Sequence, residues 1–334
     1  MMTFAKNIAL SCLLLSALVA AAAWYSLHMP GKAHRGSLDP MTTEEMDLSG
    51  RLRRHVAAIA SVPHNASSRY YEDLRRAAFY IEGELVKSGF QVVRQTYEAR
   101  DREVWNIEAT LEPTAPAAST ASLVIGAHYD SAGEAPGAND NGSGVAALLE
   151  IAQLLKAGPA PKQRLRLVFF VNEEPPFFQT PQMGSRQYVE LLQERGEKIA
   201  GMISLETLGA FSDQPGSQKY PEPFHLVLPN VGNFIAFVAM PGSRAFMHRV
   251  IGSFRAHTKF PTIGGVAPTI IQGVDWSDHG SFAAEDIPAL MITDTAVFRY
   301  PHYHRPTDTP DKVDYDKLAR ISKGIERVVR ELAW

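Results

Sequence analysis

The stretch 122-SLVIGAHYDSAGEAPGANDNGSGVAALLEIAQLLKAG-158 decides the fold. It predicts a buried strand over 122–127, then a glycine-rich loop, then a helix over 144–158, with five glycines in 126–144. A continuously apolar strand that leads into a helix is typical of a parallel sheet with both faces covered. In such sheets, sites form in the loops at the carboxyl ends of the strands, and the glycine-rich loop lies at such an end.

The same alternation of strands and helices continues along the chain. Further strands are expected at 90–97, 103–111, 165–171, 202–206, 224–228 and 288–293. Helices are expected at 72–88, with Gly89 as the C-cap, and at the C-terminus, where apolar residues from Leu318 to Leu332 recur at helical spacing. Residues 113–121 form a loop of small residues. The fold class predicted is α/β, with a mostly parallel, mixed central sheet and helices on both faces.

The composition restricts the kinds of partner. The chain has 334 residues, 45% of them hydrophobic and 21% charged, which are ordinary values for a globular protein. Its formal net charge of -3 provides no strong field for nucleic acid, so none is expected as a partner. Cys12 is the lone cysteine, which excludes an intrachain disulfide. No feature of the sequence indicates an oligomeric state.

The N-terminus carries a targeting-like segment. Lys6 is followed by the apolar run 8-IALSCLLLSALVAAAAWY-25, whose position argues against a buried core helix. Residues 1–28 are expected to be a cleaved signal peptide or an uncleaved signal anchor, and both alternatives stay open. Residues 29–46 are expected to be a linker and 47–334 a single domain. The body of the protein is expected outside the cytoplasm: periplasmic, secreted, or anchored to the membrane and facing outward.

Residues able to bind a metal follow several of the predicted strands. Each of them alone is weak evidence, because loop histidines and Asn/Asp turns are common. Together they can converge on one crevice, since they lie beyond strands of one sheet. Histidine combined with carboxylates, without cysteine, suits a catalytic zinc site. The candidates are His128, Asp130, Asp140, Glu173, Glu174, Glu206 and His304.

The pair Glu173–Glu174 and the number of carboxylates indicate how such a site would work. Adjacent residues at a strand end can divide their roles, one binding metal and the other acting as general base for an activated water. Asp130, two residues after His128, is placed to orient that imidazole. Two Zn²⁺ would balance the three ligand carboxylates plus one hydroxide, whereas a single zinc would be overcompensated.

Six spaced motifs resemble those of metallopeptidase family 28, the co-catalytic zinc aminopeptidases. The resemblance covers roughly residues 50–334 and implies a zinc-aminopeptidase-like, three-layer fold and a peptide substrate. It also implies that Asp140 bridges two zincs, that Glu174 and His304 complete one site, and that His128 and Glu206 complete the other. Glu173 would be the general base and Asp130 would orient His128. The motifs are 126-GAHYDS-131, 138-ANDNGSG-144, 173-EEPP-176 with 184-GS-185, 203-ISLETLG-209, 277-SDH-279 and 303-YHRPTDTPDKVDY-315.

Some positions depart from the family pattern. The position of Glu206 is often Asp in such enzymes, and the longer Glu would loosen the second zinc or shift the substrate pocket. The segment 175-PPFFQTPQM-183 is longer than expected, with Phe177 and Phe178 either lining a pocket or covering the sheet edge. His302 competes with His304, which is preferred because it directly precedes the R-P-T-D-T-P stretch.

Three functions stay open at this point. The leading one is a two-zinc exopeptidase, in particular an aminopeptidase. The second is a single-zinc glutaminyl cyclase, since those enzymes resemble this family and share an H-Y-D-S run and a Glu-Glu pair. The third is a catalytically inactive binding module on the same fold, which the filled ligand positions disfavour.

Overall fold

A central eight-stranded sheet organises the molecule. The computed structural model describes residues 2–67, 69–114 and 121–334. The strands are β1 (Val92–Ala99), β2 (Arg102–Leu111), β3 (Ser122–His128), β4 (Leu165–Phe170), β5 (Ile199–Glu206), β6 (Ile235–Ala239), β7 (Thr262–Val266) and β8 (Ala289–Thr293). Their order across the sheet is β1-β2-β4-β3-β5-β8-β6-β7. The central strands β4, β3, β5 and β8 are parallel, while β1, β2 and β6 join by antiparallel pairing. This confirms the predicted mixed, mostly parallel α/β sheet.

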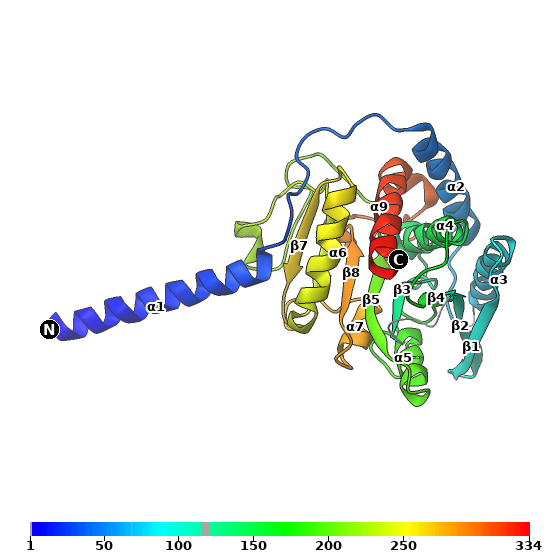
Figure 1. Cartoon of the computed structure of the whole chain (residues 1–334), viewed down its shortest axis with the longest axis horizontal. Coiled ribbons are helices and arrows are strands. Elements are labelled where there is room, and N and C mark those ends of the chain that lie inside the picture. The colour runs from blue at the N-terminus through cyan, green and yellow to red at the C-terminus, as the bar shows by residue number, and fades with distance from the viewer. Residues whose placement is uncertain (1, 68, 115–120) are drawn as a thin grey trace.

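Helices cover both faces of this sheet (Figure 1). One face carries α2, α3, α4, α6 and α9, and the other carries α5 and α7. The helices are α1 (Met2–Leu27), α2 (Thr43–Ile59), α3 (Tyr71–Lys87), α4 (Gly144–Lys156), α5 (Gly184–Glu194), α6 (Arg244–His257), α7 (His279–Ala283), α8 (Ala296–Arg299) and α9 (Tyr315–Ala333). The result is three layers, helix–sheet–helix, with α1 outside them.

The apolar run of β3 explains why two layers of helices are needed. Side chains alternate between the two faces of a strand. Leu123 and Ile125 accordingly pack into the core under α4 and α9, while Val124 packs into the smaller core under α5 and α7. Every residue of β3 is buried, so both faces of the strand are covered. Its neighbours β4 and β5 hold it on both edges, which fixes its carboxyl end inside the molecule.

The prediction of a strand at 224–228 is wrong. Phe224–Leu226 forms a short 3₁₀ turn, and Leu226 and Val227 are exposed. Pro221, Pro223 and Pro229 surround this run, and proline cannot donate to a strand ladder. The strands actually present on this side, β6 and β7, are short, and β7 contains two glycines, so neither produces a strong strand pattern.

Two other predicted segments differ in extent from what the structure describes. Helix α2 begins at Thr43, inside the segment 29–46 expected as a linker. Thr42 and Glu45 form a capping box, each side chain accepting the other's backbone N–H, which starts the helix there. Of the predicted loop 113–121, residues 115–120 lie outside the described residues.

Helix α1 projects from the layers as an isolated rod (Figure 1). Its residues Leu10–Leu27 form an 18-residue window with a mean hydropathy of 1.9, none of it buried. Among the described residues, this is the one helix long and apolar enough to cross a membrane. Such a helix near an N-terminus also fits a signal sequence.

Candidate metal centre

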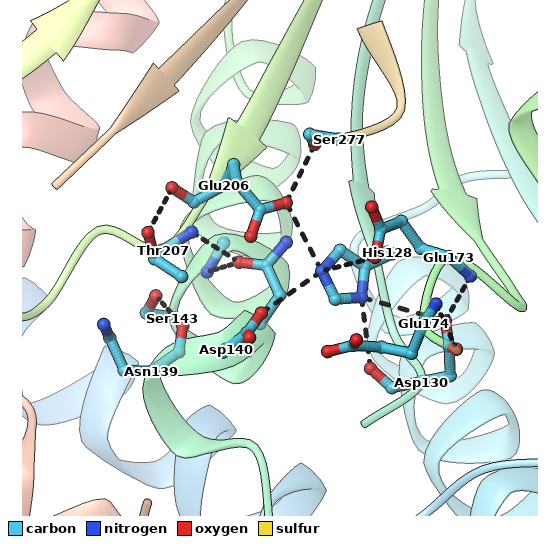
Figure 2. A network of polar contacts seen from close by, with 12 residues as sticks. His128, Asp130, Asn139, Asp140, Ser143, Glu173, Glu174, Glu206, Thr207 and Ser277 are labelled. Atoms are coloured by element: carbon cyan, nitrogen blue, oxygen red, sulfur yellow. Dashed lines mark hydrogen bonds and ion pairs between the residues drawn. The ribbon is translucent and has the colours of Figure 1, made fainter. Parts of the chain in front are cut away.

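Four of the predicted site residues meet because β3, β4 and β5 are neighbouring parallel strands. His128 is the last residue of β3 and Glu206 the last of β5. Glu173 and Glu174 follow β4, and Asp140 lies in the segment Ala138–Ser143 that leads into α4. Since parallel strands end at the same edge of a sheet, these side chains converge there. Figure 2 shows the ring of His128 with Glu206 and Asp140 on one side and Glu173 on the other.

The side chains form two groups around one shared carboxylate. In the first, called the His304 site, His304 Nε2 lies 3.0 Å from Asp140 Oδ2 and 3.1 Å from Glu174 Oε1. In the second, called the His128 site, His128 Nε2 lies 3.4 Å from Asp140 Oδ1 and 3.3 Å from Glu206 Oε2. Asp140 thus presents one carboxylate oxygen to each site.

The donor atoms fit a bound cation. His128 Nε2, Asp140 Oδ2 and Glu174 Oε1 are buried, and within the described ranges none makes a well-aligned hydrogen bond, although His304 Nε2 lies close to both oxygens. One ligand atom from each of these three residues lies within 4.8 Å of the others. Buried polar atoms that lack partners are costly, so a cluster of such atoms needs a common partner. Imidazole nitrogens with carboxylate oxygens are a donor set that zinc accepts.

Asp130 links the two sides of the centre through three contacts. Its backbone carbonyl lies 3.1 Å from His128 Nδ1, closer than its own carboxylate at 3.7 Å. A proton on Nδ1 leaves Nε2 free to ligate a metal. The Asp130 carboxylate instead accepts the backbone N–H groups of Glu173 (3.0 Å) and Glu174 (3.1 Å). Asp130 therefore contacts His128 and also holds the backbone of the Glu pair, a contact that the sequence did not indicate.

The asparagines on either side of Asp140 explain the N-D-N run. Asn141 donates to the carbonyl of Leu205 (2.8 Å) and accepts the N–H of Thr207 (3.0 Å), on either side of the last residue of β5. Asn139 accepts the N–H of Gly209 at 2.8 Å. These side chains tie the segment that carries Asp140 to the end of β5.

Asp308 supports the same segment from the C-terminal part of the chain. Its two oxygens accept the backbone N–H groups of Asn139 (2.9 Å) and Asp140 (3.1 Å), and Tyr300 donates its hydroxyl at 2.8 Å. Burial raises the pKa of Asp308 to about 7. Asp308 lies within the motif 303–315, but its role could not be assigned from sequence, because its partners are backbone groups far away along the chain.

Ser277 supports Glu206. Its hydroxyl donates to Glu206 Oε2 at 2.8 Å, and Ser204 lies 2.8 Å from Ser277 on the other side. Ser277 belongs to the motif 277-SDH-279, in which Asp278 and His279 have no assigned role. Its contact fixes the longer Glu side chain at a position where Asp is often found.

The remaining candidates divide clearly. His302 points to Thr307 Oγ1 (2.9 Å), whereas His304 points into the centre. Phe177 packs into the core and also lines a cavity that reaches Asp130 and Glu174, which agrees with the pocket-wall alternative. Phe178 lines a separate cavity with Met183.

The ionisable groups show an excess of negative charge. Burial raises the pKa of Glu173 well above its ordinary value, and burial together with Asp140 raises the pKa of Glu174 to about 8. Burial lowers the pKa of His304, but the carboxylates of Asp140 and Glu174 outweigh this and raise it to about 11. A divalent cation bound among these groups would replace the protons that the shifts favour.

An apolar cavity adjoins the His128 site. Glu206 and Tyr303 line it together with Phe224, Met291 and Val266. The ring of Tyr303 stacks on that of His304, with centroids 3.9 Å apart. A small molecule or side chain in this cavity would lie directly beside the ligand groups.

Buried imidazoles and carboxylates, gathered at the carboxyl ends of parallel strands beside an apolar cavity, define a metal-dependent hydrolase of the α/β class. The profile of peptidase family M28 matches residues 106–329. The chain belongs to peptidase family M28.

Known proteins agree with this family. The chain is 37% identical to YfbL of Escherichia coli over 284 residues, covering 82% of this chain and 85% of YfbL. It is 27% identical to leucine aminopeptidase 1 of Arthroderma otae, covering 68% and 58% of the two chains. It is 29% identical to the probable lipoprotein aminopeptidase LpqL of Mycobacterium tuberculosis, covering 76% and 50%. The chain thus spans only 50–58% of the length of these two aminopeptidases.

Solved structures share the fold. The zinc aminopeptidase BSAP of Bacillus subtilis superposes with a TM-score of 0.67 at 14% identity, over 85% of this chain and 95% of that one. A glutaminyl cyclase of Porphyromonas gingivalis superposes with a TM-score of 0.62 at 21% identity, over 86% and 98%. At these identities both likenesses concern the fold alone.

Proposed function

We propose that this M28 peptidase is a two-zinc aminopeptidase that removes N-terminal residues from peptides. One observation carries the proposal: Asp140 presents Oδ2 to the His304 site and Oδ1 to the His128 site. A single-metal centre needs no such shared carboxylate. The aminopeptidase names of the curated relatives support the same reaction.

The residues would divide the work as follows. His304, Asp140 and Glu174 would hold one zinc, and His128, Asp140 and Glu206 the other. When bound, the zincs would supply Lewis acidity and lower the pKa of a nearby water from 15.7 to roughly 7. Asp130 would orient His128 and hold the backbone of the Glu pair.

Glu173 would act as the general base. Its Oε2 lies 3.9 Å from His128 Nε2, so its carboxylate reaches the space between the ligands without joining either closest set. Its carboxylate would accept a proton from the attacking water and deliver it to the leaving amine. The metal charge would lower its pKa, which burial raises, and so restore the ionised form.

The cavity beside Glu206 would receive the side chain of the N-terminal residue. Its lining is mainly apolar, including Phe224, Val266 and Met291, which favours a large apolar side chain.

The catalytic unit would run as one domain from α2 to α9. Helix α1 would place this domain outside the cytoplasm, as a retained anchor or a signal peptide, and the relative LpqL, named a lipoprotein, supports that location.

Metal content measured together with a substrate panel tests the proposal. We expect about two zincs per chain. Leucine p-nitroanilide should be hydrolysed and its N-acetyl form should not. Activity should be lost on treatment with 1,10-phenanthroline and return with Zn²⁺. One zinc per chain with pyroglutamate formation from a Gln-initiated peptide would instead support the cyclase, whose fold is shared. Two zincs without hydrolysis of any free-N-terminus substrate would support a binding module.

A further inference from the structure

The end of α1 is fixed to the catalytic domain. Arg244 of α6 donates to the carbonyl of Tyr25 at 3.0 Å, and its guanidinium lies 4.5 Å above the ring of Tyr25. Arg255, also on α6, donates to the carbonyl of Pro30 at 2.8 Å. Trp24 and Tyr25 are exposed at this end of the apolar span. Tryptophan and tyrosine concentrate where a membrane span meets the headgroups, so this end of α1 has the composition of an interface.

A cationic cavity lies directly beyond that end. The charged side chains that line it are Lys32, Arg35 and Arg255, together with His28. It has no carboxylate in its lining, and Lys32 and Arg35 are exposed without an ion-pair partner among the described residues. Basic residues next to a membrane span are attracted by anionic lipid headgroups.

Two loops beside α1 expose large apolar side chains. Leu226 and Val227 are 72% and 64% exposed, and Ile270 is 87% exposed. Their loops also line the apolar cavity of the metal centre, through Phe224 and Ile271, and Leu27 at the end of α1 lines the same cavity. Exposed apolar groups that gather on one face mark an interaction site.

We propose that this face, made of Lys32, Arg35, Leu226, Val227 and Ile270 around the end of α1, docks on the surface of a phospholipid bilayer that contains anionic lipids. The apolar span Leu10–Leu27 ends within this face, which favours a bilayer over a protein partner. The basic side chains contact headgroup phosphates, and the apolar loop residues enter the interfacial region.

Docking places the active-site cavity next to the membrane. The cavity is lined both by Leu27, at the end of the anchor, and by Glu206 of the metal centre. This inference about substrates rests on the proposed aminopeptidase function. The substrates within reach are N-termini of peptides and proteins held at the bilayer surface. Freely diffusing peptides have no such advantage.

Fluorescence quenching in vesicles tests the docking. The full chain with Cys12→Ser would carry Ile270→Cys or Leu226→Cys labelled with an environment-sensitive dye, in phosphatidylcholine–phosphatidylglycerol vesicles. We expect a blue shift and strong quenching by lipids with nitroxide headgroups at both positions. Val93→Cys is the control, because Val93 is an exposed apolar residue on β1, at the opposite edge of the sheet. Quenching at Ile270 and Leu226 no stronger than at Val93 would overturn the proposal.

A charge reversal tests the headgroup contact. Lys32→Glu with Arg35→Glu should reduce the quenching at Ile270 in vesicles with phosphatidylglycerol. Arg195→Glu with Lys198→Glu, an exposed basic pair after α5, should leave it unchanged. Equal quenching in both double variants would refute the role of the basic cavity.

The docking signals do not depend on catalysis, and the inactive Glu173→Gln protein should dock normally. Failure of docking and failure of the aminopeptidase proposal are therefore distinguishable. A mature chain isolated from its native membranes that begins beyond Leu27 would also overturn the docking proposal.

Discussion

The His128 site and the His304 site share Asp140 but are built differently. His128 and Glu206 end two adjacent strands, and the His128 side chain is 1% exposed. His304 comes from a turn, has a backbone φ of +55°, and its side chain is 34% exposed. A strand end inside a sheet is rigid, whereas a turn at positive φ depends on its surroundings. We therefore expect the His128 site to tolerate changes nearby better than the His304 site does.

Asp140→Asn should disrupt both metal sites at once. The amide leaves each site one anionic ligand poorer, so both metals should be lost. Activity should fall by more than the roughly 10²–10⁴-fold that a general base contributes. Zinc measured per chain and leucine p-nitroanilide hydrolysis check this. If one zinc remained bound at full occupancy, Asp140 would not bridge the sites.

Glu173→Gln separates catalysis from metal binding at both sites. The variant should keep both zincs, because Glu173 is not among the closest ligand contacts, and should lose roughly 10²–10⁴-fold in kcat. Metal analysis with steady-state kinetics is the measurement. Loss of a zinc in this variant would place Glu173 among the ligands and count against a general base.

His304→Ala should empty one site and spare the other. We expect the zinc content to fall by about half. The activation barrier of hydrolysis should rise by several kcal/mol, because one source of charge stabilisation is lost. His302→Ala is the matched control, because His302 contacts Thr307 outside the centre, and it should keep both zincs. The opposite pattern would show that His302 is the ligand.

Ser277→Ala should cause the smallest change, confined to the His128 site. It removes the hydrogen bond to Glu206, and loss of such a supporting contact weakens metal binding by about 10–100-fold. Competition with a zinc chelator should show one weakened site and one unchanged. Equal weakening of both sites would mean that the effect passes through Asp140 and not through Glu206.

The central strands and the positions of the metal-centre candidates could be predicted from sequence because both follow from local patterns. The apolar runs of β3, β4 and β5 predicted buried strands of one mostly parallel sheet, and parallel strands bring their ends to one edge. The supporting contacts of Asp308 and Ser277 could not be predicted, since they join residues distant in the chain. The hydrogen bonds from the Glu pair to the Asp130 carboxylate could not be predicted either, because their donors are backbone N–H groups, which leave no signal in the sequence.

Asp140 and His304 lie far apart along the chain, yet they meet at one site. A metal held between them would therefore act as a reversible cross-link between the first half of the sheet and the C-terminal turn. Because the unfolded chain has no such site, zinc would stabilise the folded state by mass action. Resistance to heat and to proteolysis should then rise with zinc concentration, so that availability of the metal sets the lifetime of the protein as well as its activity.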